Sequence, residues 1–383
     1  MSNLPFTWRQ NTKGLEQNTP VLEATSMDEL IRDWSSLPIE LLSLIVSHLS
    51  PNDFERFRCV CKGWNSVPCP PVPCPTLCPI PQSQWLMLYH GFSKIEFNFF
   101  HPLYKDSYRM DIPKLSDALL HCSKDGWLLM SRGNHVFFFN PFTKAKIDLP
   151  DLPHRYHFKA LSFSCAPTSS DCMVFGINGL YEINYSFISR GEEEWSVGRI
   201  RQKNVFPPSH TNPIFYKELV YCLCECGTLG VFDPKEKSWK ALPNTAKWDL
   251  AIYESYLMDS DGKLLAVFVG KKGRRVRVFV LDDSKIVWER IRDLGSKMLF
   301  VSHEASISAT KVVKGMENKI YFPRFYGKHG VFFSLATNKY ESFRSCLSRK
   351  DFPGRDEMLR CCWIEPRTER CCKEELNWLS TVD

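Results

Sequence analysis

The sequence predicts an α+β protein of more than one domain, in which a small three-helix module is followed by an all-β propeller of five to seven blades. Residues 34–67 carry apolar side chains at helical spacing. Residues 84–365 carry short apolar strands separated by turns, in a pattern that returns at intervals of roughly 40–50 residues. Aromatic residues make up 13% of the chain, which favours strands because such side chains fit a pleated, half-buried surface.

The internal repeat is clearest in three segments, at 126–150, 218–243 and 319–343. Each reads as strand, hairpin turn, strand, second turn and strand. In the first two, Asn140-Pro141 or Asp233-Pro234 opens the second turn. A four-stranded blade cannot bury both of its faces alone, whereas blades arranged around an axis cover one another. The repeat therefore favours a propeller, and a β-sandwich is the alternative.

The helical module begins with a segment that has one apolar helical face. Its apolar residues follow the i, i+3, i+4, i+7 spacing, at Pro38, Leu41, Leu42, Ile45 and Leu49. Three helices in about thirty residues bury little apolar surface, so we expect a partner to cover the remaining apolar face. A helical subdomain packed on the propeller is the alternative, and the proline-rich linker that follows argues against it.

Composition divides the chain into five segments. Few apolar anchors predict a disordered start, and clustered prolines predict an extended linker. The expected boundaries are a disordered tail at 1–33, the helical module at 34–67, a Pro/Cys-rich linker at 68–83, the propeller at 84–365 and a polar C-terminal tail at 366–383.

Charge and hydropathy restrict the partners and the compartment. A net charge of +6, spread over 383 residues, lacks the dense basic face that nucleic acid requires. No stretch approaches the roughly 20 apolar residues of a membrane helix. Residues 1–17 lack the apolar region of a signal peptide. We therefore expect a cytoplasmic or nuclear protein without nucleic-acid or membrane partners, whose 16 cysteines are reduced thiols.

The cysteines do not follow the ligand spacing of zinc sites. Cys69, Cys74 and Cys78 lack paired C-x-x-C spacing, and Cys361-Cys362 and Cys371-Cys372 are adjacent pairs. We expect no metal or cofactor, with zinc at the adjacent pairs as the alternative. A further group, Cys222, Cys224 and Cys226, alternates along an expected strand, which predicts a buried thiol face.

Charged and catalytic motifs give no independent function. The basic run at 271–277 lies between two expected strands, so a solvated hairpin tip is expected, with a nuclear localisation signal as the alternative. No metalloprotease, phosphate-loop or G-x-S-x-G motif occurs. We expect a protein that is not an enzyme. A propeller enzyme would need His or carboxylate groups that converge on the central channel.

Two resemblances to known families add a function. The pattern Leu37-Pro38-x-Glu40-Leu41-Leu42-x-x-Ile45, continued by Asp53-Phe54, Phe57 and Val60-Cys61-Lys62-x-Trp64, resembles an F-box. This resemblance implies docking on a Skp-type adaptor, which binds a cullin scaffold. The residues that it assigns to the adaptor interface are Leu37, Pro38, Leu41, Leu42, Ile45 and Val60, with Trp64 at its edge or in the module core.

The second half resembles the plant F-box proteins whose C-terminal domain is a kelch-like propeller or one of unknown function. The segments that carry this resemblance are Asp125-Gly126-Trp127-Leu128-Leu129, Phe139-Asn140-Pro141-Phe142-Thr143 and Asn318-Lys319-Ile320-Tyr321-Phe322. Together the two resemblances imply a non-catalytic substrate-recognition subunit of a Skp–cullin–F-box ubiquitin ligase, with an unknown protein target. A Skp-bound or free propeller scaffold without a ligase role is the alternative.

Overall fold

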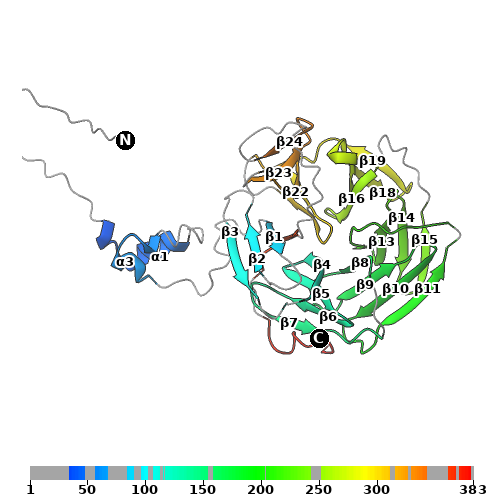
Figure 1. Ribbon diagram of the computed structural model, residues 1–383, viewed down its shortest axis with the longest axis horizontal. Helices are drawn as coiled ribbons and strands as arrows, with labels where there is room; N and C mark the ends of the chain where they lie inside the picture. The colour runs from blue at the N-terminus through cyan, green and yellow to red at the C-terminus, as the bar shows by residue number, and fades with distance from the viewer. Residues whose placement is uncertain are drawn as a thin grey trace, which may run out of the picture.

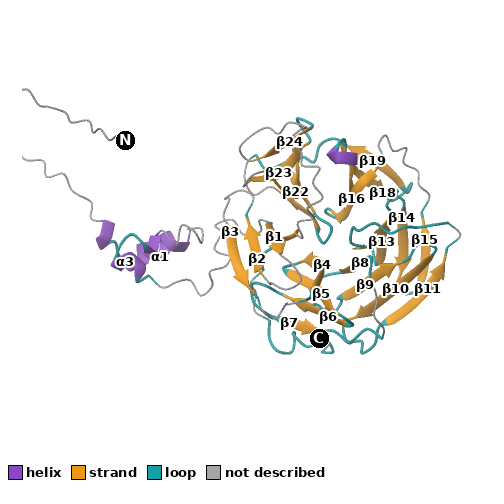
Figure 2. Ribbon diagram, viewed as in Figure 1, coloured by secondary structure: helices purple, strands orange, loops and turns teal. Residues whose placement is uncertain are grey.

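The computed structural model shows a β-propeller and a separate small helical module (Figure 1). The residues that it describes are 34–47, 57–67, 84–89, 96–101, 107–112, 115, 117–153, 158–202, 204–242, 252–310, 315–326, 329–342, 361–367 and 371–380. Strands account for nearly all of the secondary structure of the propeller (Figure 2).

The described strands form six blades, in agreement with the predicted five to seven. Blade 1 contains β25 (Cys361–Ile364), β1 (Trp85–Tyr89), β2 (Glu96–Phe100) and β3 (Ser107–Asp111). Blade 2 contains β4 (Leu119–Lys124), β5 (Trp127–Arg132), β6 (His135–Phe139) and β7 (Lys146–Asp148). Blade 3 contains β8 (Ala160–Phe163), β9 (Met173–Asn178), β10 (Glu182–Ser189) and β11 (Ser196–Arg201).

The remaining three blades follow around the ring. Blade 4 contains β12 (Ile214–Tyr216), β13 (Leu219–Leu223), β14 (Leu229–Asp233) and β15 (Ser238–Ala241). Blade 5 contains β16 (Ile252–Asp259), β17 (Leu264–Gly270), β18 (Val276–Asp282) and β19 (Val287–Ile291), with the 3-10 turn η4 (Lys271–Gly273) at its tip. Blade 6 contains β20 (Lys297–Val301), β21 (Ser306–Thr310), β22 (Lys319–Tyr326), β23 (His329–Ser334) and β24 (Lys339–Ser342).

The first strands of successive blades meet around the axis. β25 contacts β4, β4 contacts β8, β8 contacts β12, β12 contacts β16, and β16 contacts β21. Blade 6 departs from the four-stranded pattern, because β20 pairs in parallel with β22 while β21 folds back on the inner side of β20. The extra strand β21 therefore lies where a first strand lies in the other blades.

The ring is closed by the last strand of the chain. β25 pairs antiparallel with β1, in the register Leu86 opposite Trp363 and Met87 opposite Cys362. Blade 1 is thus made from three strands of the N-terminal side and one strand of the C-terminal side. Burial supports this closure, since all four residues of β25 are buried.

The Asn/Asp turns that revealed the repeat have a common geometry. The side-chain oxygen of Asn140 accepts the backbone N–H of Phe142 at 2.9 Å, and that of Asp233 accepts the N–H of Lys235 at 2.9 Å. Asp282 does the same for Ser284 at 2.9 Å. An Asx side chain that bonds two residues ahead stabilises a turn. Each turn therefore leads the third strand of its blade back into the fourth.

The apolar core lies between blades. Phe138 of blade 2 packs edge-on against Phe163 of blade 3, with ring centroids 5.0 Å apart. Phe175 of blade 3 packs on Phe232 of blade 4 at 4.9 Å. Large aromatic side chains supply most of this buried area, and close pairs of them add stability beyond the area itself. The stacking of blades therefore buries the faces that a single blade would leave exposed.

The segment expected to be a polar C-terminal tail packs on the propeller instead. Residues 371–380 lie along blades 2 and 3, and the Trp378 ring is buried beside Phe138 at 6.0 Å. Arg190 donates hydrogen bonds to the backbone carbonyls of Glu375 and Asn377, each at 2.9 Å. A buried tryptophan and a buried guanidinium thus attach the segment, and Cys371 and Leu376 pack half-buried against the same cluster.

The helical module contains η1 (Trp34–Ser36), α1 (Ile39–Ser47) and α3 (Lys62–Asn65). The second predicted helix falls largely outside the described residues, apart from a helical turn at Phe57 and Arg58. The expected tail at 1–33 and the expected linker at 68–83 lie outside the described residues. No helix in the described part of the chain is long and apolar enough to cross a membrane.

Candidate functional site

The helical module has its own small core. Leu42, Val46, Phe57 and Val67 are buried together, and Leu37, Ile45 and Trp64 pack half-buried against them. None of the five propeller clusters among the described residues includes a side chain of the module. The module therefore has a separate apolar core.

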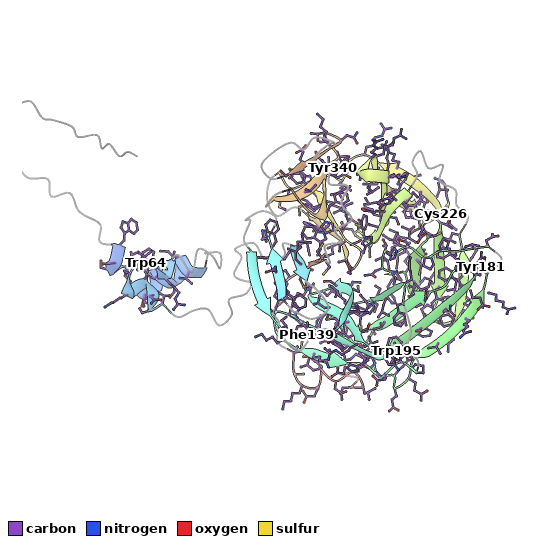
Figure 3. The ribbon with its side chains drawn as sticks, in the orientation of Figure 1. Trp64, Phe139, Tyr181, Trp195, Cys226 and Tyr340 are labelled. Atoms are coloured by element: carbon purple, nitrogen blue, oxygen red, sulfur yellow. The ribbon has the colours of Figure 1, made fainter. Side chains whose placement is uncertain are left out.

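Hydrogen bonds and ring packing hold the short helices together. The Pro38 carbonyl accepts the N–H groups of Leu41 and Leu42 at 3.1 Å each, which begins α1 with a residue that has no N–H to satisfy. Trp64 donates its indole N–H to the Trp34 carbonyl at 2.9 Å, which joins α3 to η1. Its ring lies 4.5 Å from that of Phe57. Trp64, which Figure 3 labels, thus connects α3 both to η1 and to the helical turn at Phe57.

The same module exposes apolar side chains. Its described residues carry five of the thirteen exposed large apolar side chains in the described chain, although they are a small part of it. We call these side chains, together with the exposed Pro38, the apolar module surface; its members are Trp34, Pro38, Ile39, Leu41, Leu44 and Val60. Leu41 and Leu44 are one helical turn apart and share one side of α1. Exposed apolar side chains at this density are typical of an interaction surface.

The sequence-predicted interface residues divide into three groups. Pro38, Leu41 and Val60 are exposed and belong to the apolar module surface. Leu42 is 3% exposed and lies in the module core. The other three are half-buried between core and surface, at Leu37, Ile45 and Trp64.

Three members of the apolar module surface escaped the sequence analysis, namely Trp34, Ile39 and Leu44. Their signal was present, because six of the nine residues of α1 are apolar, more than one buried face of a short helix can hold. The i, i+3, i+4 spacing predicts a single apolar face on the helix, so it does not reveal the second apolar side of α1. Trp34 precedes the helix and so had no periodicity to mark it.

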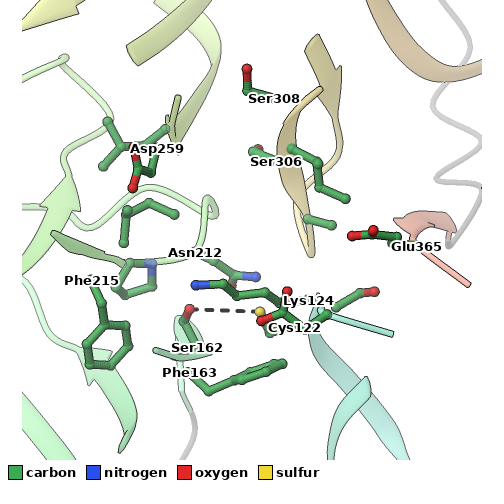
Figure 4. Close-up of a pocket in the computed structure, with 17 residues that line it drawn as sticks. Cys122, Lys124, Ser162, Phe163, Asn212, Phe215, Asp259, Ser306, Ser308 and Glu365 are labelled. Atoms are coloured by element: carbon green, nitrogen blue, oxygen red, sulfur yellow. Dashed lines mark hydrogen bonds between the residues drawn. The ribbon is translucent and has the colours of Figure 1, made fainter. Parts of the chain in front are cut away.

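A second candidate site is a cavity of about 270 Å³ in the central channel (Figure 4). First strands from most blades line it, together with the extra strand β21. Its polar lining includes Lys124, Asp125, Asn212, Asp259, Ser306 and Glu365. Asn212 donates to the backbone carbonyls of His121 and Glu304, at 3.0 and 2.9 Å. This amide therefore joins blades 2 and 6 across the channel.

The ionisable groups of this cavity differ in protonation and in their partners. Burial raises the pKa of the Cys122 thiol to about 11, so it stays protonated at neutral pH, 3.8 Å from the Ser162 hydroxyl. The Lys124 ammonium is already engaged by the Ser164 carbonyl. Burial also raises the pKa of Glu365. Among the described lining residues, Cys122 is thus a neutral thiol and Lys124 is held by a backbone carbonyl.

The structure separates the cysteines considered for zinc. Cys361 and Cys362 are buried in β25, whereas Cys371 and Cys372 lie in the C-terminal segment. Among the described residues, no group of three or more His, Cys, Asp or Glu is placed to hold a metal ion. Cys69, Cys74 and Cys78 lie outside the described residues.

The expected hairpin tip and thiol face have different outcomes. The basic run does connect two strands of a blade, since it follows β17 directly and ends in the first two residues of β18. The expectation of one buried thiol face is wrong for its last member: β13 ends at Leu223, and Cys226 lies exposed in the following turn. The chain reverses there because Gly227 takes a φ of +85°, which favours glycine.

The blade 3 loops expose a further apolar group. Leu180 and Tyr181 form the tip of the β9–β10 hairpin, and Tyr181 is 68% exposed. The Leu180 carbonyl accepts the N–H of Phe206 at 3.0 Å, which brings the exposed Val205 beside this tip. We call Leu180, Tyr181 and Val205 the blade 3 apolar tip.

Comparisons with known proteins identify both parts of the chain. Residues 34–69 match the F-box domain, and residues 99–343 match the family described as KIB1-4 beta-propeller. The chain therefore belongs to the KIB1-4 beta-propeller family and is a plant F-box protein with a propeller. The predicted resemblance to this class is confirmed.

Curated relatives from Arabidopsis thaliana share this arrangement. The chain is 31% identical to "F-box/kelch-repeat protein At1g57790", over 87% of this chain and 94% of that protein. It is 30% identical to "F-box protein At1g49360", over 80% and 65% of the two chains. It is 28% identical to "F-box protein At3g56470", over 78% and 81%.

Proposed function

We propose that this protein is the substrate-recognition subunit of a Skp–cullin–F-box ubiquitin ligase, working in the cytoplasm or nucleus. The observation that carries the proposal is the apolar module surface, which lies on the segment that matches the F-box domain. A Skp-type adaptor is the partner that an F-box implies. Its apolar groove would cover Leu41, Leu44 and their exposed neighbours.

Such a subunit needs no catalytic group of its own. The propeller would hold a protein target while the adaptor and cullin bring a charged conjugating enzyme close to it. Tethering raises the effective concentration of the two reactants and so accelerates transfer without new chemistry. The cavity is compatible with this role, because its Cys122 thiol stays protonated and its Lys124 ammonium is already engaged.

The adaptor contact can be tested with a charge on α1. Leu41→Asp/Leu44→Asp places two carboxylates on the exposed side of the helix without removing a module-core side chain. Burying unpaired charges in an interface is strongly unfavourable. We expect co-purification of the full chain with a Skp-type adaptor to fall at least tenfold.

The matched control is Leu180→Asp, which changes an apolar propeller residue of similar exposure. This variant should retain the adaptor as the wild type does. Equal adaptor binding by the Leu41→Asp/Leu44→Asp variant and the wild type would contradict the proposed interface. Adaptor binding that never recruits a cullin would instead favour a Skp-bound scaffold without a ligase role.

The loops of the propeller would bind the target. The blade 3 apolar tip is a candidate contact, because exposed aromatic side chains contribute strongly to protein interfaces. Removing the protein should lengthen the half-life of its target. Tyr181→Ala should have the same effect while leaving the adaptor bound, and an unchanged target half-life would exclude this tip as the contact.

A further inference from the structure

Two cysteines meet in the turn between β13 and β14. The turn is closed by the N–H of Gly227, which donates to the Cys224 carbonyl at 2.9 Å. Its base is held by the N–H of Cys224, which donates to the Thr228 carbonyl at 2.8 Å. The backbone around both cysteines is therefore fixed by hydrogen bonds on each side.

The two sulfur atoms are close. Cys224 Sγ and Cys226 Sγ are 3.1 Å apart, and the backbone N–H of Cys226 also points to Cys224 Sγ at 3.5 Å. A disulfide bond is about 2.05 Å long, so a movement of about 1 Å would bring the sulfurs to bonding distance. The turn has thus already brought the two thiols into position to react.

The pair combines an accessible thiol with a protected one. Cys226 is exposed and Cys224 is buried. Burial raises the pKa of Cys226, but hydrogen bonds from the Thr228 hydroxyl and Cys224 outweigh it, and the net pKa lies below the ordinary thiol value. Burial raises the pKa of Cys224. Cys226 is therefore the more accessible and the more readily ionised thiol of the pair, and the thiolate is the reactive form.

We propose that Cys224 and Cys226 form a thiol–disulfide exchange site that takes a low-molecular-weight disulfide, of the glutathione disulfide class, as its oxidant. The Cys226 thiolate attacks one sulfur of glutathione disulfide, whose S–S bond breaks and releases one glutathione thiolate. Cys224 then loses its proton and attacks Cys226 Sγ, which releases the second glutathione. The two cysteines lose two electrons and two protons, and two glutathione thiols form.

The site faces the same side of the propeller as the blade 3 apolar tip. The β13–β14 and β9–β10 turns join the second and third strands of adjacent blades, so equivalent positions place both turns on one face. Between the cysteines, the Glu225 carboxylate contacts Lys159 at 3.3 Å. Formation of the disulfide would restrain Cys224 and Cys226, which flank Glu225. It would therefore also restrain the position of the Glu225 carboxylate on that face of the propeller.

Mass spectrometry of the full chain can test the site. The reduced chain is incubated with glutathione disulfide, alkylated under denaturing conditions and digested with trypsin. The peptide 218–235 contains Cys222, Cys224 and Cys226. We expect most of this peptide to carry a Cys224–Cys226 disulfide and alkyl only on Cys222, with full reversal by dithiothreitol.

Three serine variants assign the steps. Cys224→Ser should stop at a glutathione adduct on Cys226, because the resolving thiol is gone. Cys226→Ser should give neither adduct nor disulfide in this peptide. Cys222→Ser is the matched control and should behave as the wild type, since Cys222 lies on β13 with its side chain buried.

The wild-type map alone can overturn the proposal. Complete alkylation of Cys226 after treatment with glutathione disulfide would contradict the proposal. A disulfide between Cys222 and either Cys224 or Cys226 would contradict it as well. Peptide mapping also separates this site from Cys165, whose pKa a hydrogen bond from Cys172 lowers to about 6. Oxidation confined to the Cys165 peptide would count against the Cys224–Cys226 site.

Discussion

Two histidines of the propeller, His101 and His121, resist protonation in the folded protein well below neutral pH. His101 is fully buried with its ring edge-on to Trp85, 4.8 Å away. Burial lowers the pKa of His101 to about 3 and that of His121 to about 4, from an ordinary value of 6.5. Charging either ring inside the fold is unfavourable because the interior cannot solvate the proton's charge.

These histidines predict how stability depends on pH. Their folded pKa values lie below the unfolded value, so the unfolded state binds more protons below pH 6.5. The free energy of unfolding should therefore fall as pH drops from about 6.5 toward 4, by up to about 1.4 kcal/mol per pH unit for each histidine. Urea denaturation at pH 7.5, 6.5, 5.5 and 5.0 measures this slope.

A substitution isolates one of the two contributions. His121 bonds to the Ser131 hydroxyl at 2.7 Å, and glutamine offers a polar group for that contact without a titrating proton. His121→Gln should reduce the slope below pH 6.5 by close to one proton. An identical slope in the variant and the wild type would show that His121 is not neutralised by folding.

At the scale of elements, the C-terminal segment is attached through one arginine. Arg190, at the end of β10, donates to the carbonyls of Pro167, Glu375, Asn377 and Ser380. Its guanidinium also lies over the Trp378 ring at 6.0 Å. The planar fork of arginine suits several acceptors at once, which a lysine ammonium does not match.

Removing this group should detach the segment. Arg190→Met keeps a long apolar stem but removes the donor from four backbone carbonyls, of which that of Pro167 is in a buried contact and the others are partly buried. A buried polar group left unsatisfied costs about 1–3 kcal/mol. We expect the free energy of unfolding to fall by about 3 kcal/mol, together with faster proteolysis within 368–383. Arg201→Met is the control, because Arg201 is 90% exposed and should change stability little.

This attachment is not predicted from the sequence alone. The segment 371–380 carries only two large apolar residues besides Trp378, namely Leu376 and Leu379, which are too few to mark a buried face by their spacing. The ring partner of Trp378, Phe138, lies more than 200 residues earlier in the chain. The Asn140 and Asp233 turns were predictable for the opposite reason, because side chain and backbone two residues apart suffice to form them.

At the scale of the whole molecule, the propeller depends on joining its two ends. β25 supplies the inner strand of blade 1, and the Trp363 indole donates to the Val301 carbonyl of blade 6 at 3.1 Å. The ring thus links residues that are almost 300 positions apart. Contacts of such separation are gained late in folding, because loop-closure entropy must be lost first.

Truncation tests the closure. A chain that ends after residue 360 lacks β25 and leaves the apolar face of β1 and the edge of blade 1 uncovered. We expect this chain to lose cooperative urea unfolding and to aggregate, since open strand edges pair with other chains. A chain that ends after Arg367 keeps β25 and should unfold cooperatively at a lower urea concentration.

A cooperative, soluble chain ending at residue 360 would contradict the closing role of β25. The lower midpoint expected for the chain ending at Arg367 comes from the loss of Trp378, whose burial the longer truncation also removes. Comparing the two truncations therefore separates ring closure from attachment of the C-terminal segment.

The repeat in the sequence determined the fold class, and the apolar pattern of residues 37–64 determined the helical module. Both rest on neighbours within a few residues, such as the Asx turns and the turn-by-turn spacing of α1. The sequence leaves the number of blades open, because only blades 2 and 4 carry the Asn/Asp-Pro turn between their third and fourth strands. Which side of α1 is exposed depended on packing against Phe57 and Val67.

Only the tertiary structure decided the features that join distant residues. It placed β25 in blade 1, folded β21 into the central channel and brought Arg190 to the C-terminal segment. It also placed Cys226 in the turn after β13, with its Sγ atom 3.1 Å from Cys224 Sγ. The physical reason is that local patterns fix backbone conformation, whereas burial and closure are settled by contacts across the whole chain.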